Sequence, residues 1–162
     1  MSEETRRDIV LIVIFSLVSA IGMMSVFLGC RFLAWIVIVI SDSFLFIILL
    51  LSSLRSEDDG FSDRHPWTTG FFPRRTVGLL LVALLFLAVV SGFAGLYVGV
   101  EVFPSGKTPL DALYTSFFVL GFTDYSPKPG YGQLVVIAEL VSGVLLLVAL
   151  FPLLISRIST FK

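Results

Sequence analysis

Long apolar stretches alternate with short polar segments along the chain. Four of the apolar stretches are close to the ~20 residues that an α-helix needs to cross ~30 Å of hydrocarbon. They cover approximately residues 9–28, 32–54, 76–100 and 134–155. This pattern predicts an all-α integral membrane protein with four transmembrane helices per chain.

The composition agrees with a membrane protein. Hydrophobic residues make up 57% of the chain and charged residues 14%, and the mean hydropathy of +1.02 lies outside the range of soluble domains. The 11 Lys and Arg residues nearly balance the 12 Asp and Glu residues, so there is no net basic field to hold nucleic acid. One Cys and one His exclude a disulfide framework and are too few for a His/Cys zinc site within one chain. We therefore expect a protein that is not an enzyme, needs no cofactor and contacts membrane lipid.

The distribution of Lys and Arg residues predicts the orientation in the membrane. The connection at 29–31 is so short that the first two helices must form an antiparallel hairpin. Alternate sides of the spans then carry eight and three basic residues. The eight are Arg6, Arg7, Arg55, Arg64, Arg74, Arg75, Arg157 and Lys162, and the three are Arg31, Lys107 and Lys128. Because basic residues concentrate on the cytoplasmic side, both termini are predicted to be cytoplasmic.

A polar segment at 56–75 divides the chain into two units. We interpret it as a cytoplasmic linker between an N-terminal transmembrane hairpin, 1–55, and a second unit, 76–162. The hairpin has no arginine at every third position, so a voltage-sensing helix is not supported. Small residues in both units predict close helix packing. They are Ser19, Gly22 and Ser25 in the first helix and Gly92, Gly95 and Gly99 in the third.

The connection between the third and fourth spans, 101–133, contains the signal for an additional short helix. Thr108 can cap the helix, Pro109 suits its first position, and Asp111 completes an approximate capping box. The residues from there to about Leu120 give roughly three helical turns, which is half a membrane crossing. The helix breakers Ser-Pro-Lys-Pro-Gly follow at 126–130.

A half-length helix followed by extended backbone is best explained as a re-entrant pore helix with a filter loop. Extended backbone at membrane depth must be covered by protein or line water, because lipid cannot satisfy its polar groups. The helix would aim the negative end of its dipole into the bilayer, and the next residues would offer carbonyl oxygens to a monovalent cation. Because one copy cannot surround an ion, this interpretation predicts a homo-oligomer, most naturally a cyclic homotetramer.

Several short motifs lie in the second unit. They are Asp-Ala-Leu-Tyr at 111–114, Ser-Phe at 116–117, Leu-Gly-Phe-Thr-Asp-Tyr-Ser-Pro at 120–127, Gly-Gln-Leu at 132–134 and Ala-Glu-Leu-Val at 138–141. With these motifs, 76–162 resembles the prokaryotic potassium channel pore domain of the tetrameric, two-helix-plus-pore-loop type. The resemblance implies an outer helix, pore helix, filter and inner helix in a prokaryotic plasma membrane. It also implies that Asp111, Tyr114 and Glu139 support the pore helix and that Gly143 is a gating hinge.

The chain departs from the family's pattern at the filter. Thr123 stands where the family has its second filter glycine, and a β-branched residue is disfavoured at the positive φ that glycine readily adopts. Val119 stands where the family has a threonine, so the hydroxyl of the innermost ion site is absent. About three residues, roughly one helical turn, are also missing between Tyr114 and Leu120. Either the pore helix is shorter or the filter holds fewer ion sites.

These features together predict passive conduction of cations with a weakened preference for K⁺ over Na⁺. The residues expected to coordinate the cation through their backbone are Leu120, Gly121, Phe122 and Thr123. Asp124 follows them, and two roles are open for it. Its carboxylate either concentrates cations at the pore mouth or braces the filter from behind by hydrogen bonding.

Two carboxylates lie deep within apolar spans, where an ionisable group is a functional hypothesis by default. The resemblance suggests that Glu139 contacts the pore helix of its own or the next subunit. Cation attraction and protonation gating are the alternatives for this residue. Asp42 is expected to bond to a neighbouring helix through Ser16, Ser19 or Ser25, and a role in ion transport is the alternative.

Two further functions remain open. A four-span secondary transporter would use Glu139 or Asp42 as its coupling carboxylate, but this function leaves the capped half-helix unexplained. A pore-like membrane scaffold without conduction is supported only by the altered filter.

Overall fold

The computed structural model of the chain describes residues 3–55, 75–103, 107–119 and 126–158. Over these residues α-helices are the only regular secondary structure, and there is no strand. The helices are α1 (Glu3–Leu28), α2 (Arg31–Arg55), α4 (Arg75–Gly99), α5 (Pro109–Val119) and α6 (Tyr131–Ile158). All except α5 are long and apolar enough to cross a membrane, which confirms the prediction of four long apolar helices and suggests a multi-pass membrane protein. Most of the predicted linker, 56–74, lies outside the described residues.

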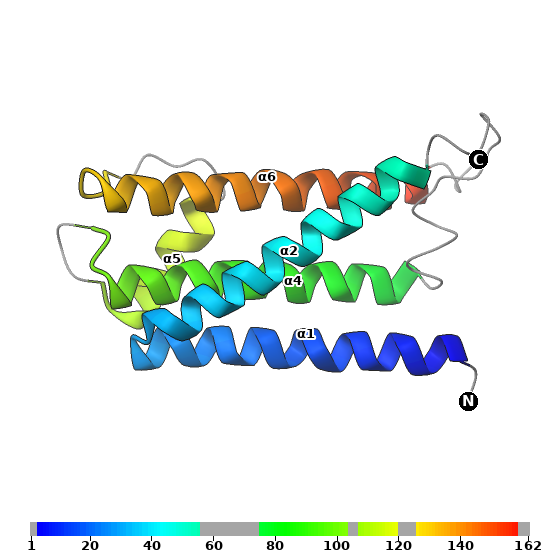
Figure 1. The fold of residues 1–162 in the computed structure, drawn as a ribbon, viewed down its shortest axis with the longest axis horizontal. Coiled ribbons are helices and arrows are strands. Elements are labelled where there is room, and N and C mark those ends of the chain that lie inside the picture. The colour runs from blue at the N-terminus through cyan, green and yellow to red at the C-terminus, as the bar shows by residue number, and fades with distance from the viewer. Residues whose placement is uncertain (1–2, 56–74, 104–106, 120–125, 159–162) are drawn as a thin grey trace.

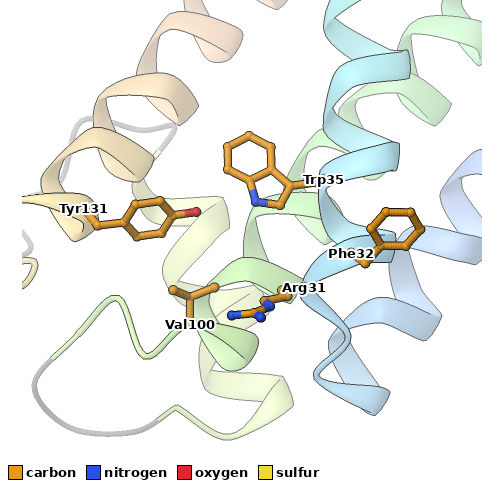
Figure 2. Close-up of a pocket in the computed structure, with 5 residues that line it drawn as sticks. All are labelled: Arg31, Phe32, Trp35, Val100 and Tyr131. Carbon is orange, nitrogen blue, oxygen red and sulfur yellow. The ribbon is translucent and has the colours of Figure 1, made fainter.

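The four long helices form a bundle in which α4 lies between α1 and α6 (Figure 1). The helix α2 crosses this layer diagonally, from the end of α1 to the far end of α6. The first residues of α1 and the last helical residues of α6 lie at the same end of the bundle. At the opposite end, where α2 and α6 begin and α4 ends, the helices enclose an open groove (Figure 2).

The turn between α1 and α2 depends on a glycine. Gly29 adopts a φ of 60°, a left-handed conformation that residues with a side chain rarely adopt. The next N–H, of Cys30, donates a hydrogen bond of 3.1 Å to the carbonyl of Ser25, which is a Schellman arrangement that ends α1. The chain therefore reverses within two residues, as the predicted hairpin requires.

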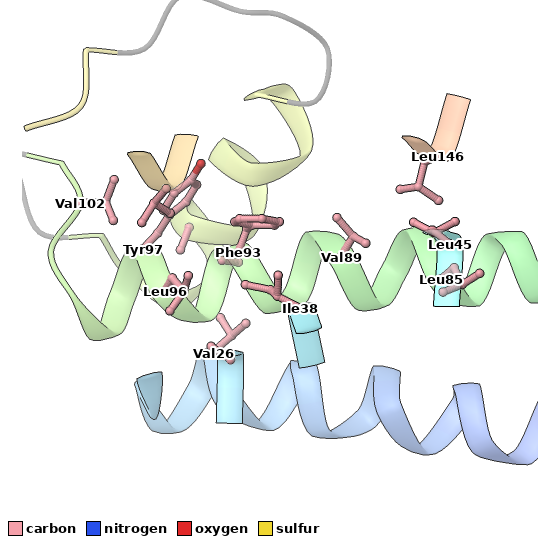
Figure 3. Packing of buried hydrophobic residues seen from close by; sticks show 14 of the residues in the cluster. Val26, Ile38, Leu45, Leu85, Val89, Phe93, Leu96, Tyr97, Val102 and Leu146 are labelled. Atoms are coloured by element: carbon pink, nitrogen blue, oxygen red, sulfur yellow. The ribbon is translucent and has the colours of Figure 1, made fainter. Parts of the chain in front are cut away.

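The core of the bundle is built around α4. In its most apolar window 61% of the residues are buried, against 28–33% in the other long helices. A helix that is apolar all round is expected to be enclosed by others, and α4 contacts α1, α2, α5 and α6. Figure 3 shows Phe93 and Leu96 of α4 beside Val26 of α1, Ile38 of α2 and other core residues.

Small residues allow the hairpin to approach α4 closely, as the sequence predicted. A Cβ atom on Gly99 would lie 2.8 Å from the backbone oxygen of Gly29, and one on Gly92 would lie 2.8 Å from Cγ1 of Ile38. A Cβ on Gly95 would collide with the hydroxyl of Ser25. Since lipid tails are as apolar as these helices, close van der Waals contact of this kind is one of the interactions that hold membrane helices together.

Candidate functional site

The short helix α5 begins at the predicted cap. The Thr108 hydroxyl accepts a hydrogen bond from the Asp111 N–H at 3.3 Å and donates one to the Asp111 carboxylate at 2.6 Å. Pro109 is the first helical residue, and the first helical hydrogen bond runs from the Ala112 N–H to the Thr108 carbonyl at 2.9 Å. The predicted half-length helix and its start are therefore confirmed.

One face of α5 is buried against the bundle and the other is exposed. The buried residues are Ala112, Thr115, Ser116 and Val119. The exposed residues include Leu110, Tyr114 and Phe117. The helix contacts α4, α6 and α1, and Figure 1 shows it between α4 and α6.

The two ends of the segment that carries α5 lie beside each other, at the end of α4. The chain leaves α4 through Glu101, which has a φ of 50°, and Val102. It returns at Lys128, whose N–H donates to the Val102 carbonyl at 2.8 Å and whose ammonium lies 3.2 Å from the Glu101 carboxylate. The connection 103–127 is thus a loop closed at one end of α4 and α6.

The middle of α5 lies far from that end. The Ser116 hydroxyl donates to the backbone carbonyl of Val90 at 2.9 Å, and Val90 precedes the last residue of α4 by nine positions. At 1.5 Å per residue, Val90 is about 14 Å along the helix. The Glu139 side chain, which also contacts Ser116, follows the start of α6 by eight positions, or about 12 Å. These distances are close to half of the ~30 Å hydrocarbon thickness.

Glu139 joins three helices at this depth. Its side chain is 0% exposed, and each carboxyl oxygen has a hydroxyl partner. The Tyr97 hydroxyl of α4 donates to Oε2, and the Ser116 hydroxyl of α5 is bonded to Oε1. The expected contact between Glu139 and the short helix is present within the same chain. A buried carboxyl group is costly unless it is hydrogen-bonded, and here both oxygens are.

Asp42 contacts a different helix from the one expected. The Ser142 hydroxyl of α6 donates to Asp42 Oδ2 at 2.8 Å and lies 3.0 Å from the Ala138 carbonyl. Bonding to a neighbouring helix is confirmed, but the expected partners Ser16, Ser19 and Ser25 are wrong. Ser16 is exposed, Ser19 donates to the Leu84 carbonyl and Ser25 donates to that of Gly22. The reason is the diagonal course of α2, which carries its middle across α4 to α6 (Figure 1).

Two polar atoms close to this contact have no partner among the described residues. They are Asp42 Oδ1 and the hydroxyl of the neighbouring Ser41, both buried. Asp42 thus differs from Glu139, whose two oxygens are both bonded.

The expected filter residues lie outside the described part of the chain. They are Leu120, Gly121, Phe122, Thr123 and Asp124, so carbonyl coordination and the two roles of Asp124 stay predictions.

The other residues implied by the resemblance are described. Asp111 is exposed in the first turn of α5, and Tyr114 is exposed with its ring centroid 4.3 Å from that of Phe118. Gly143 is buried on α6, four residues after Glu139.

Sequence reasoning missed three hydroxyl groups that complete the buried contacts, those of Tyr97, Ser116 and Ser142. Tyr97 offered a usable signal, since a tyrosine inside an apolar span usually places its hydroxyl on a polar partner. Its partner is distant in sequence, so only the folded structure identifies it.

The described residues contain no group of three or more His, Cys, Asp or Glu side chains that could hold a metal ion. No family model matches the chain, and neither a curated protein nor a solved structure matches it. Function is therefore inferred from the residues and their geometry.

Proposed function

We propose that the chain is the subunit of a homotetrameric channel that conducts monovalent cations passively across a membrane. One observation carries this proposal. The half-length helix α5 belongs to a loop that is closed at Val102 and Lys128, yet its Ser116 bonds to Val90 and Glu139 about midway along the long helices. This arrangement supports a re-entrant pore loop.

The position of α5 gives the following residues a cation-binding role. Backbone that continues from the end of α5 at membrane depth must be covered by protein or line water. The negative end of the α5 dipole points into the bilayer interior on this proposal, which favours a cation there. Four copies of the carbonyl groups of residues 120–123, one from each subunit, then surround the ion. The resemblance of 76–162 to potassium channel pore domains supports the same assembly.

The proposed channel selects weakly between K⁺ and Na⁺. Val119, the last residue of α5, is 2% exposed and has no hydroxyl to offer an ion. Thr123 restricts the backbone where the family has glycine. Fewer well-held coordinating oxygens discriminate less between the two ions.

Glu139 has a supporting role in this channel. Through Tyr97 and Ser116 it fixes α5 to both long helices of the pore unit, α4 and α6. Because both of its oxygens are bonded, neither is left for a permeant ion. The hairpin of α1 and α2 acts as an outer scaffold packed on α4. The unequal distribution of basic residues supports cytoplasmic termini. The resemblance to prokaryotic pore domains supports a prokaryotic plasma membrane.

A transporter is the second candidate, and one observation favours it. Asp42 Oδ1 is buried without a partner among the described residues, so it is the better coupling carboxylate of the two. In that case transport requires a proton gradient, whereas a passive channel conducts without one.

Reconstituted liposomes test the proposal. With K⁺ on one side and Na⁺ on the other, the protein should conduct in the absence of a proton gradient, with a reversal potential near zero. Gly121→Val should abolish this current and leave the assembly intact, while Asp42→Asn should leave it unchanged. Crosslinking should show four subunits. A dimer, or flux that strictly requires protons and is lost in Asp42→Asn, contradicts the channel.

A further inference from the structure

An open groove of about 390 Å³ lies at the end of the bundle where α2 and α6 begin. Its volume is within the range of small-molecule sites, ~300–1,000 Å³. The residues that line it are Arg31, Phe32, Trp35, Val100 and Tyr131. Figure 2 shows the Arg31 guanidinium, the Trp35 indole nitrogen and the Tyr131 hydroxyl facing a common space, while the Phe32 ring points away from it.

The surface that lines the groove is mostly apolar, and the Arg31 guanidinium is the one charged group among its lining residues. Arg31 is exposed and forms no ion pair with any described residue. The other cations described at this end have contacts of their own, because Lys128 pairs with Glu101 and Lys107 lies over the Phe103 ring. The lining residues include no carboxylate, so the guanidinium, the indole N–H and the phenol O–H have no acidic side chain among them to bind.

The groove lies where a membrane changes from hydrocarbon to headgroups. Arg31 and Tyr131 are the first residues of their candidate spans, and Val100 follows the last residue of another. Trp and Tyr side chains concentrate at this depth because one end of each is apolar and the other polar. The exposed side chains of Trp35 and Val39 continue from the groove along α2. A ligand here therefore has one anionic part and one apolar part.

We propose that this groove binds an anionic phospholipid. The phosphate accepts hydrogen bonds from Arg31, Trp35 and Tyr131, and an acyl chain follows the exposed face of α2. A free phosphate ion would leave that apolar face unused. A zwitterionic lipid would bring its own cation close to Arg31, so the negatively charged headgroup is preferred. The site lies outside the proposed pore and does not depend on conduction.

Tryptophan fluorescence tests this site in the full-length protein. The chain has two tryptophans, so Trp67→Phe leaves Trp35 as the single reporter. The protein is reconstituted in mixed phosphatidylglycerol and phosphatidylcholine vesicles in which one lipid, at a low mole fraction, carries brominated acyl chains. Brominated phosphatidylglycerol should quench Trp35 more strongly than brominated phosphatidylcholine at the same fraction.

Variants separate the groove from general surface charge. Arg31→Gln should reduce the preference for phosphatidylglycerol by about tenfold, the scale of losing a hydrogen bond from a charged group to the phosphate. Arg31→Lys, which keeps the charge but loses the planar fork, should retain part of the preference. Lys107→Gln is the matched control, because it removes a charge at the same end outside the groove, and it should change nothing.

Three results would overturn the site: equal quenching by the two lipids, an unchanged preference in Arg31→Gln, or an equal loss in Lys107→Gln. Displacement of the lipid by millimolar inorganic phosphate would also overturn it, since the site would then recognise a free anion. The helical circular dichroism of Arg31→Gln checks its folding. If that variant does not fold, Arg31→Lys takes its place. A preference in Arg31→Lys as strong as in the parent protein overturns the proposed contact between the Arg31 guanidinium and the lipid phosphate.

Discussion

The carboxyl group of Glu139 and the hydroxyl group of Ser116 meet in the apolar interior and connect α6 with α5. Ser116 has one hydroxyl proton but lies against two acceptors, Glu139 Oε1 and the Val90 carbonyl. Tyr97 completes the cluster by donating to the other Glu139 oxygen. The cluster therefore needs a hydrogen-bonding group of glutamate shape at position 139, and a negative charge is not part of that requirement.

The first prediction follows from this count of donors and acceptors. In Glu139→Gln, the amide N–H can donate to Ser116 while the amide oxygen accepts from Tyr97, so the thermal stability in detergent should stay close to that of the parent protein. In Glu139→Leu, the Tyr97 hydroxyl loses its acceptor, which should cost about 1–3 kcal/mol. Thermal unfolding followed by circular dichroism measures both.

The same variants distinguish support from ion coupling. Glu139→Gln should retain passive cation flux in liposomes, because the glutamine still fixes α5. A stable Glu139→Gln protein that has lost all flux would instead make the carboxylate itself the functional group.

A second prediction concerns the hydroxyl of Tyr97. Tyr97→Phe keeps the ring that packs edge-on against Phe103, at 4.9 Å between centroids, but removes the donor to Glu139. We expect a loss of about 1–3 kcal/mol because a buried carboxyl oxygen is left without a partner. Tyr114→Phe is the matched control, since Tyr114 is 60% exposed, and it should have no effect.

A double-mutant cycle measures the interaction between Tyr97 and Glu139 separately from their other contacts. In the Glu139→Leu background, Tyr97→Phe removes a hydroxyl that no longer has its acceptor, so the substitution should be neutral or stabilising. The coupling free energy should fall within about 0.5–3 kcal/mol, as for residues in direct contact. Equal effects of Tyr97→Phe in the two backgrounds would mean that this hydrogen bond contributes nothing.

Much of the architecture follows from local patterns in the sequence. The lengths of the apolar stretches predicted the four long helices, and Thr108 with Pro109 predicted the start of α5. The apolar pattern predicts the start of α6 three residues late, because Tyr131, Gly132 and Gln133 are not a continuous apolar run. Gly130, with a φ of 83°, and the hydrogen bond from the Leu134 N–H to its carbonyl begin the helix earlier.

The contacts between helices could be predicted less well from the sequence. The contact of Glu139 with α5 was predicted only through the resemblance to potassium channel pore domains. The predicted partners of Asp42 were wrong because no local pattern in the sequence indicates the angle at which α2 crosses α4. Periodicity shows which face of a helix is apolar, whereas the crossing angle depends on packing between helices that are distant in sequence. The glycines of α4 predicted close approach but not which backbone atoms would meet.

A third prediction tests that close approach. In Gly99→Ala, the new Cβ would lie 2.8 Å from the Gly29 carbonyl oxygen, a backbone atom in the turn between α1 and α2. The turn must shift, and overpacking of this kind costs about 1–3 kcal/mol. Ala83→Leu adds more volume at an exposed position of the same helix and should leave the unfolding temperature unchanged. Equal stability of Gly99→Ala and the parent protein would contradict the described contact.

The last prediction addresses selectivity and rests on the proposed channel. Thr123→Gly introduces the residue that potassium channel pore domains have at the corresponding position, and glycine reaches positive φ without the steric penalty of a β-branched residue. The neighbouring carbonyl groups can then hold a dehydrated ion more uniformly, so the permeability to K⁺ relative to Na⁺ should rise. Reversal potentials under bi-ionic conditions measure this ratio, and Thr123→Ser, which removes the branching methyl but keeps a side chain, is the matched control. A ratio that rises in neither variant, while both still conduct, would place the selectivity-determining oxygens elsewhere than at residues 120–123.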